Sequence, residues 1–280
     1  MTLDRRALLS GLAVSGMMAS GARAQDDPFD LQGRPVQGGH LIGRTWPRAL
    51  IFLDGEALTT ASADGWFIVG FDRDATLSHR ITARSGSREH STEVTLAQGQ
   101  FPSHSISGLP PSTVAPQDPA LLARIREQAA IKAEAYASRL DADYFRDGFS
   151  SPLETLRVTS AWGSQRILNG TPAQPHYGVD LGAPTGAPIT APAAGLVTLA
   201  ESDFHYEGGL VFIDHGQGLV TAYLHQSRVE VSVGQTVYRG QLIGRVGARG
   251  RATGPHLCWR MKWRDRRLDP ILLLGVRAPA

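Results

Sequence analysis

The chain has 280 residues, of which 42% are hydrophobic, so it is long enough for about two domains with buried cores. Its formal net charge is +2 and its sequence pI is about 8.9, and so small an excess of positive charge gives no indication of a nucleic-acid partner. The mild basicity is compatible with an anionic polymer such as cell wall, and a solvated surface accounts for it as well.

The N-terminus has the features of an export signal. Arg5 and Arg6 precede an apolar run over residues 7–19, and Ala22-Arg23-Ala24 has the small-x-small pattern of a cleavage site. The run is too short for a comfortable membrane span, and no cysteine nearby could carry a lipid anchor. The paired arginines favour the twin-arginine route, although an ordinary secretory signal also begins with positive charge. We therefore expect a signal peptide over residues 1–24, export to a Gram-negative periplasm, and no stable membrane span after its removal.

Residues 26 to about 110 are expected to form a first module. Short apolar segments separated by turn residues cover 48–53, 65–70, 79–83 and 91–96. This pattern predicts a small antiparallel β-sandwich, which we interpret as a docking or positioning module. Its four histidines lack ligand spacing and are interpreted as surface or structural residues: His40, His79, His90 and His104.

A linker helix is expected over residues 118–147. Asp118 supplies an N-cap, and Pro119 suits the first helical turn. Apolar residues then recur every three or four positions: Leu122, Ile125, Ala129, Ala133, Tyr136, Leu140 and Tyr144. The stripe is expected to pack against the chain's own domains, with a short coiled coil as the alternative.

The region over 150–275 has the composition of an antiparallel β-domain. Glycine and proline turns separate expected strands at 196–199, 210–213, 219–224, 229–233, 241–246 and 256–261. The basic residues at the end of this region are expected to form a solvated edge: Arg260, Lys262, Arg264, Arg266 and Arg267. Contact of that edge with acidic wall polymers is the alternative. The mainly β composition of both modules, joined by one helix, defines the expected fold class.

A metal site is indicated within this domain. His176 and Asp180 supply an imidazole and a carboxylate, which are two of the three protein ligands of an open catalytic zinc site. The alternation after residue 255 places His256 and Cys258 on one face of a strand, so the Cys258 thiolate can complete the set. His256 and His225 then stand beside the metal as proton-transfer groups. Taken singly, each of these residues is more often structural.

Together, the segments match a family pattern. His-x-Gly-x-Asp at 176–180, Tyr-x-His at 223–225 and Thr-Gly-Pro-His-Leu at 253–257 resemble the lysostaphin-type, or LytM-type, zinc endopeptidases, which cut peptide cross-links of bacterial cell wall. The resemblance covers about residues 158–269. It implies the duplicated hybrid motif β-fold and an Ig-like identity for the first module. It also implies hydrolysis of peptidoglycan peptide stems by a zinc-activated water.

The resemblance assigns roles to individual residues. One zinc ion would be held by His176, Asp180 and Cys258, and the two catalytic histidines would be His225 and His256. By analogy with the family, Arg166 and Asn169 are candidate substrate contacts, with a polar surface turn as the alternative. His215 resembles part of a recurrent family turn outside the metal set.

The third ligand departs from the pattern. The family usually has the second histidine of a His-x-His pair where this chain has Cys258. Cys258 either binds zinc as a thiolate or is a small buried residue left after the site lost its metal. We favour metal binding, because every other member of the set is present. The alternatives are a metal-poor regulator whose partner is a cell-wall amidase or division protein, and a wall-binding module that does not cut.

Overall fold

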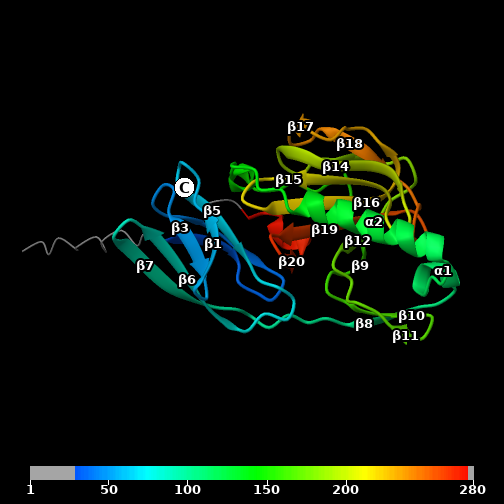
Figure 1. The fold of residues 1–280 in the computed structure, drawn as a ribbon, viewed down its shortest axis with the longest axis horizontal. Coiled ribbons are helices and arrows are strands. Elements are labelled where there is room, and N and C mark those ends of the chain that lie inside the picture. Colours follow the sequence, from blue (N-terminus) through cyan, green and yellow to red (C-terminus); the bar gives the residue numbers. More distant parts are fainter. Residues whose placement is uncertain (1–28, 277–280) are drawn as a thin grey trace, which may run out of the picture.

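The computed structural model describes residues 29–276, and the predicted signal peptide over 1–24 lies outside them. The described part is mainly β with one long helix, and it divides into a smaller N-terminal part and a larger C-terminal sheet domain (Figure 1). Within residues 29–276, no helix is both long enough and apolar enough to cross a membrane.

The N-terminal part contains two small antiparallel sheets. One has the order β1 (Asp30–Arg34), β2 (His40–Arg44), β5 (Trp66–Gly70), and the other β4 (Glu56–Thr60), β3 (Leu50–Leu53), β6 (Ser78–Ser85), β7 (Arg88–Thr95). Both sheets contribute to one hydrophobic cluster, with Ile42 and Phe67 from the first and Ile51 and Ile81 from the second. The four strands expected from the sequence are present, each within a few residues of its predicted limits.

The N-terminal part packs directly on the C-terminal domain. Its hydrophobic cluster continues into Trp263 and Leu268. Gly70 lies so close to Leu268 that a Cβ atom there would be 2.6 Å from Leu268 Cδ1. The Arg73 guanidinium donates a hydrogen bond to the Gly163 carbonyl at 2.7 Å. Shared apolar packing and polar contacts therefore fix the two parts together.

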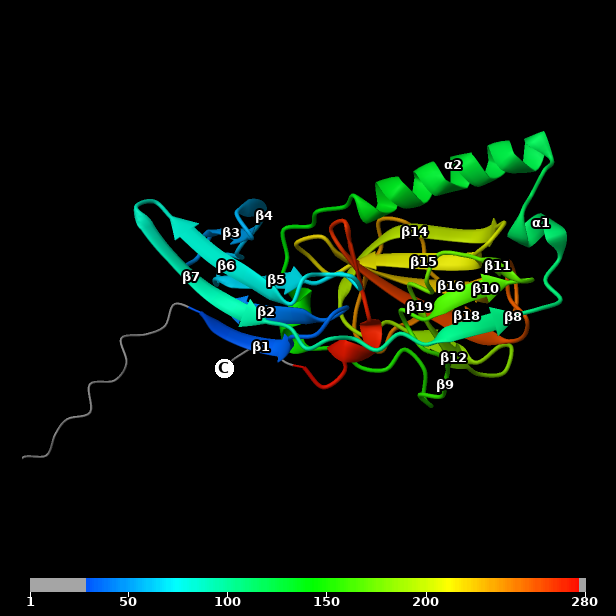
Figure 2. The same cartoon turned by 90° about the horizontal axis from the view of Figure 1, so that it is seen from below.

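The chain leaves the N-terminal part along the C-terminal domain. β8 (Ser103–Ile106) pairs in parallel with β10 (Gln165–Leu168), which pairs with β11 (Thr171–Pro172). A single turn of helix, α1 (Pro111–Val114), follows at the far end of the domain, and α2 then returns along it (Figure 2). The segment that joins the two parts is therefore built into the C-terminal domain.

The long helix begins as predicted and ends earlier. α2 runs over Pro119–Tyr136, and the Asp118 carboxylate accepts hydrogen bonds from the Ala120 and Leu121 N–H groups at 3.2 and 3.3 Å. The predicted range of 118–147 is therefore wrong at its C-terminal end, because the helix stops at Tyr136 and a non-helical segment leads from there to η1 (Tyr144–Asp147).

A buried carboxylate accounts for this early end. Asp214 Oδ2 accepts hydrogen bonds from Ser138 Oγ at 2.6 Å and from the Leu140 N–H at 3.0 Å. If α2 continued past Ala137, the Leu140 N–H would bond within the helix and not to Asp214. The Asp214 contacts therefore favour a non-helical segment after Tyr136.

The helix does pack against the chain's own sheet, and α2 lies along β14 and β15 (Figure 2). The predicted stripe is not its buried face, because the buried residues are Gln128 and Ala135, whereas Ala129 and Ala133 are exposed. Tyr136 contributes a ring contact with Phe212 at a centroid distance of 4.5 Å.

A ten-stranded sheet forms the C-terminal domain. Its main path is β17 (Thr236–Val237), β14 (Gly195–Phe204), β15 (Gly208–Asp214), β16 (Leu219–Val229), β19 (His256–Trp263), β12 (Val179–Gly182), β9 (Val158–Ser160). The remaining strands are β13 (Pro188–Thr190), β18 (Leu242–Val246) and β20 (Arg266–Leu268), and η2 (Pro270–Leu273) follows. The expected strand at 229–233 is wrong, because β16 continues through an irregularity near His225 to Val229, and the following residues form a turn.

Candidate metal centre and active site

Two neighbouring strands position two of the predicted ligands. Asp180 on β12 lies directly opposite Cys258 on β19 in the antiparallel register, so their side chains emerge side by side. His176 lies in the loop before β12. Its N–H donates to the Ser164 carbonyl at 2.8 Å, and its own carbonyl accepts from the Gly163 N–H at 2.7 Å. Backbone contacts therefore hold His176 over the two strand residues.

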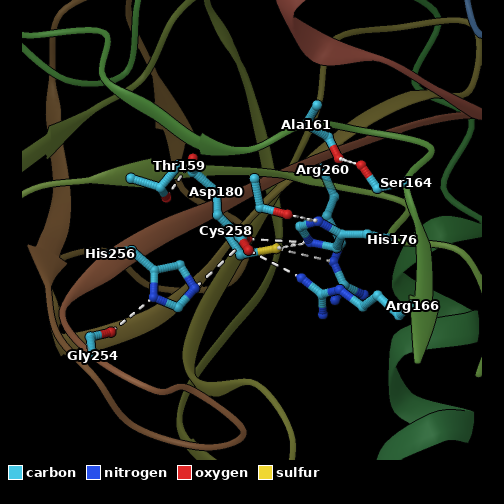
Figure 3. Close-up of polar contacts among 11 residues, drawn as sticks. Thr159, Ala161, Ser164, Arg166, His176, Asp180, Gly254, His256, Cys258 and Arg260 are labelled. Carbon is cyan, nitrogen blue, oxygen red and sulfur yellow. Dashed lines mark hydrogen bonds and ion pairs between the residues drawn. The ribbon is translucent and has the colours of Figure 1, made fainter. Parts of the chain in front are cut away.

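The structure brings the three predicted ligands together. His176 Nε2 lies 3.2 Å from Asp180 Oδ1 and 3.4 Å from Cys258 Sγ (Figure 3). The three donor atoms all lie within 4.8 Å of one another. The three residues are only 2%, 8% and 1% exposed, respectively. The three polar atoms thus converge at one buried point, although His176 and Cys258 are 82 residues apart in the sequence.

The donor set fits one zinc ion. Asp180 Oδ1 is buried and has no hydrogen-bond partner among the described residues, which is costly unless another group satisfies it. Ser160 Oγ lies 3.2 Å from His176 Nδ1, and this contact directs Nε2 of the ring towards the other two donors. Imidazole, carboxylate and thiolate are all ligands that zinc accepts. Together, His176, Asp180 and Cys258 leave a coordination position for water or substrate.

The glycine of the His-x-Gly-x-Asp motif makes room for the sulfur. A Cβ atom at Gly178 would lie 2.8 Å from Cys258 Sγ and 2.8 Å from Arg260 Cγ. Both distances are shorter than real side chains tolerate. A larger residue at this position would therefore displace the ligand or the guanidinium beside it.

Two further histidines present their Nε2 atoms to the site. Nδ1 of His225 lies 2.8 Å from the Arg249 carbonyl, and Nδ1 of His256 lies 2.8 Å from the Gly254 carbonyl. Because a carbonyl only accepts hydrogen bonds, each Nδ1 carries the proton when the ring is neutral, and each Nε2 keeps its lone pair. The two ring centroids are 4.7 Å apart, and His256 Nε2 is 3.6 Å from Asp180 Oδ1.

The backbone at His225 adopts a conformation that is uncommon for a side chain of its size. Its φ is +66°, in the left-handed region, and its N–H donates to the Glu207 carbonyl at 2.7 Å. Glu207 is 6% exposed, and its carboxylate forms an ion pair with Lys132 of α2. The helix is thereby connected to the residue that fixes the backbone of His225. This connection could not be predicted from the sequence, since no local pattern relates Lys132 to Glu207.

Burial and neighbouring groups set the charge states of the site. Burial lowers the pKa of His225 to about 4 and also lowers the pKa of His256. Burial by itself would raise the pKa of Asp180, but the close contact with His176, supported by the charges of His256 and Arg166, holds it below its usual range. At neutral pH the two imidazoles are therefore neutral and the carboxylate is ionised, as ligands and general bases require.

The two candidate substrate contacts have partners within the protein. Arg166 Nη2 lies 3.0 Å from Asp180 Oδ2, so Arg166 belongs to the site through a ligand. Asn169 accepts a hydrogen bond from the Leu109 N–H at 3.2 Å and donates to the Leu109 carbonyl at 2.8 Å. These two bonds hold the segment after β8. A substrate contact by Arg166 or Asn169 stays a prediction.

That segment narrows the space above the histidines. Ile106 and Leu109 face Asp180, His225 and His256 across a cavity of about 50 Å³. A wider cavity of about 570 Å³ opens on the other side of the site, between β8 and the loop that precedes β19. The two cavities share Ile106, Asp180 and His256 in their linings, so the site has a wide opening and a confined space beside the candidate general bases.

One member of the predicted solvated edge belongs to the site, so that prediction is wrong for Arg260. Arg260 Nε donates to Cys258 Sγ at 3.5 Å (Figure 3). Burial by itself would lower the pKa of Arg260, but the negative charge of a Cys258 thiolate outweighs it and raises that pKa. The two-residue alternation along β19 placed Arg260 on the Cys258 face and could have revealed this contact.

Two further cations of that edge lie over aromatic rings. Lys262 lies over the Tyr136 ring at 4.9 Å, and Arg267 lies over the Tyr177 ring at 4.4 Å. His215, expected outside the metal set, is buried and bonded through both ring nitrogens, to the Ala194 carbonyl at 2.6 Å and Thr221 Oγ1 at 2.7 Å. It therefore has a structural environment.

Three convergent donor atoms beside two neutral imidazoles, on an antiparallel sheet, have the arrangement that a metallohydrolase centre requires. Residues 174–270 match Peptidase family M23. The C-terminal domain of this chain belongs to that family.

Similar proteins have been described in several bacteria. Peptidoglycan DD-endopeptidase ShyA of Vibrio cholerae is 39% identical over 116 residues, which cover 41% of this chain and 27% of that protein. DD-carboxypeptidase/endopeptidase Mpg of Neisseria meningitidis is 34% identical over 127 residues, covering 45% and 29%. The chain thus spans less than a third of the length of either relative.

One solved structure resembles nearly the whole molecule. The crystal structure of a candidate M23 peptidase from Pseudomonas aeruginosa superposes with a TM-score of 0.67 and 28% sequence identity. The match covers 86% of this chain and 96% of the other. The common architecture therefore includes the N-terminal sheets as well as the M23 domain.

Proposed function

We propose that this chain is an exported zinc metallopeptidase that hydrolyses peptide cross-links of peptidoglycan. The observation that carries the proposal is the convergence of the His176, Asp180 and Cys258 donor atoms on one buried point, where Asp180 Oδ1 accepts no hydrogen bond from the described residues. The family of the domain and the activity named for ShyA support the reaction and the substrate. Because those relatives are much longer, the substrate of this chain remains a proposal.

His225 and His256 supply the proton transfers. Zinc at this site would supply the Lewis acidity that activates water and polarises the scissile carbonyl. The Nε2 lone pair of one histidine accepts the proton of the attacking water, and a protonated Nε2 then delivers a proton to the leaving amine as the C–N bond breaks. The carbonyl partners of both Nδ1 atoms keep the rings oriented throughout. Once it has accepted the proton of the water, that same histidine is an imidazolium, and its Nε2–H can also stabilise the negative charge that develops on the carbonyl oxygen.

The test combines metal content with product analysis. The mature chain should contain about one equivalent of zinc and release peptide fragments from purified peptidoglycan, identified by mass, and a chelator should abolish their release. Cys258→Ala should lose the zinc and the fragments together. Protein without zinc, or fragments that persist at full rate in chelator, would contradict the proposal.

One observation favours a second function, a metal-poor regulator of cell-wall amidases. Ile106 and Leu109 leave a cavity of only about 50 Å³ beside His225 and His256, which is small for a peptide. Metal-free protein that stimulates an amidase, without releasing peptide fragments itself, would support the regulator. Binding to peptidoglycan with neither activity would instead indicate a wall-binding module.

We also propose that the N-terminal part is an Ig-like module that positions the catalytic domain and that export follows the twin-arginine route. Two small sheets with one shared core support the first proposal. The second rests on Arg5 and Arg6 and would allow zinc to be loaded before the protein reaches an oxidising compartment. Unchanged export after both arginines are replaced by lysine would contradict it.

A further inference from the structure

A second cavity adjoins the metal centre. It has a volume of about 450 Å³ and lies between α2, the face of the sheet formed by β16 and β19, and the loop that leads to His176. α2 runs along this side of the domain (Figure 2), and its residues Ala129, Lys132, Ala133 and Tyr136 line the cavity. His176 and Arg166 both line it, and Arg166 also contacts Asp180. A ligand that fills this cavity can therefore extend to the reacting centre.

The lining of this cavity is strongly cationic. Five segments far apart in the chain contribute its charged residues, which are Lys132, Arg166, Arg251, Arg260, Lys262 and Arg267, together with the carboxylate of Glu207. Six cations and one carboxylate give a formal excess of +5. Counting also a Cys258 thiolate and the nearby carboxylates of Asp180, Asp72 and Asp265, the excess is +1. The residues that line the cavity themselves thus form a marked local concentration of positive charge in a chain of net charge +2.

The cations differ in how they are compensated. Three of them have anionic partners: Lys132 pairs with Glu207, Arg166 pairs with Asp180, and Arg260 contacts the Cys258 sulfur. Among the described residues, Lys262 and Arg267 form no ion pair through their side chains, which instead lie over aromatic rings. The excess positive charge is thus located at the outer part of the cavity, beneath α2.

The electrostatics of the lining support an anionic ligand. Burial lowers the pKa of Lys262, and the charge of Arg267 lowers it further. Burial likewise lowers the pKa of Arg251, with the charges of Arg260 and Arg166 adding to the effect. The charged forms of Lys262 and Arg251 are therefore destabilised by desolvation and by neighbouring cations, and the carboxylates of Asp265 and Asp72 at Lys262 and of Glu207 at Arg251 offset part of this. An anion in the cavity would reverse the second of these effects.

We propose that this cavity binds a free carboxylate of an acidic peptide whose scissile bond lies at the metal centre. The inference rests on the proposed function, since it takes the ligand to be the substrate's own peptide. Phe212, Leu224 and Met261 also line the cavity, so it can accommodate an aliphatic side chain that ends in the carboxylate. The choice of substrate would then depend on the metal ligands and also on charged side chains of α2, β19 and β20.

A direct binding measurement tests the proposal without catalysis. In the full mature chain carrying His225→Ala, we would titrate a fluorescently labelled peptide with free side-chain and terminal carboxylates, and the same peptide with those carboxylates amidated. The acidic peptide should bind about tenfold or more tightly, because a charge-assisted contact is worth roughly a factor of ten or more. Its affinity should also fall as salt increases.

Two matched variants locate the binding site. Lys262→Gln combined with Arg267→Gln removes the two cations that have no ion-pair partner, and both lie outside the metal ligands and the histidines. This double variant should reduce the ratio of affinities for acidic and amidated peptides to about one. Arg126→Gln removes an exposed cation of α2 that does not line the cavity, so it should keep the wild-type ratio.

The outcomes separate this proposal from the proposed function. Equal binding of acidic and amidated peptides, or a ratio that is unchanged in the double variant, overturns the carboxylate site even if peptidoglycan is cleaved. Selective binding lost only in the double variant supports the site even if no hydrolysis is found. Circular dichroism of each variant at the assay temperature verifies its fold, and a misfolded double variant is replaced by the single Lys262→Gln protein, which should lose part of the ratio.

Discussion

The N-terminal part and the C-terminal domain both bury histidines within β-sheets, but they use them differently. In the N-terminal part His79 Nδ1 lies 2.6 Å from the Asp54 carboxylate, and His40 is enclosed without a hydrogen-bond partner. In the C-terminal domain the buried atoms of His176, Asp180 and Cys258 instead converge on a common point. The comparison teaches that the convergence of donor atoms with unused bonding capacity marks the chemical site, while residue type and burial alone do not.

Removal of a metal ligand should give the largest difference between the two parts. Asp180→Ala should lose zinc and about 10⁴-fold in activity, equivalent to about 5 kcal/mol in the activation barrier, since the Lewis acid is lost. Asp54→Ala is the matched control, because it removes a histidine-bonded carboxylate from the N-terminal part and should retain both zinc and activity. Metal analysis and peptidoglycan digestion measure the two effects. If Asp180→Ala kept one equivalent of zinc, Asp180 would not be a zinc ligand and would not differ from Asp54 in this respect.

Removal of a candidate general base should have a smaller effect. His225→Ala should retain zinc and lose about 10³-fold in the rate of hydrolysis, or about 4 kcal/mol, because it removes proton transfer and leaves all three ligands. His79→Ala, in the N-terminal part, should hydrolyse peptidoglycan at nearly the wild-type rate. Loss of the metal from His225→Ala would show that His225 is a ligand, and an unchanged rate would exclude it as the base.

The local period of the chain was enough to predict much of the site. Alternation along one strand placed His256 and Cys258 on a common face, and Asp118 followed by Pro119 correctly located the start of the long helix. These features depend on residues close together in sequence. The spacing of His176 and Asp180 became informative only when combined with the family pattern.

Contacts between distant segments could not be predicted in this way. The end of the helix depends on the Asp214 carboxylate, which lies 74 residues from Leu140 in the sequence. The pairing of Lys132 with Glu207 likewise joins α2 to a hairpin of the sheet. Such contacts are set by tertiary packing, which overrides local helix propensity and leaves no periodic signal. The cationic cavity beneath α2 escaped prediction for the same reason.

One buried histidine in each part should make the folded protein less stable in acid. Burial, reinforced by Arg34, lowers the pKa of His40 to about 4, and burial lowers that of His215 to about 4. Between pH 6.5 and 4 the unfolded chain therefore binds more protons at these groups, so the stability they contribute is complete above about pH 6.5 and is lost as pH falls towards 4. Each group should account for about 3 kcal/mol of this loss.

Two substitutions divide this acid sensitivity between the parts. His40→Leu removes a titrating group that has no hydrogen bond, so denaturant titrations should show a smaller loss of stability between pH 7 and pH 4.5. His215→Leu should reduce the same loss but also cost about 1–3 kcal/mol at pH 7, because it leaves the Ala194 carbonyl and Thr221 Oγ1 without their partner. An undiminished acid loss in His40→Leu would contradict the assignment.

The smallest expected effect concerns the identity of the third ligand. With Asp180 and a Cys258 thiolate, a zinc centre has a formal charge of 0, and with histidine in place of the cysteine it has +1. A more positive centre acidifies water and polarises a carbonyl more strongly. Cys258→His should therefore stay active to lower pH and hydrolyse peptide about tenfold faster, which corresponds to an activation barrier lower by about 1.4 kcal/mol. Zinc-saturated proteins compared over a pH series provide the measurement.

The structure explains why this effect is expected to be modest. Arg260 lies 3.5 Å from Cys258 Sγ, so its positive charge already offsets part of the thiolate charge that distinguishes the two ligands. Arg260→Gln in the wild-type background should therefore lower kcat, in the direction opposite to Cys258→His. Because Arg260 also lines the cationic cavity, the change in KM must be separated from the change in kcat. Equal rates and superimposable pH profiles for the wild type and Cys258→His would refute the charge argument, because the formal charge of the centre would then have no effect on the reaction.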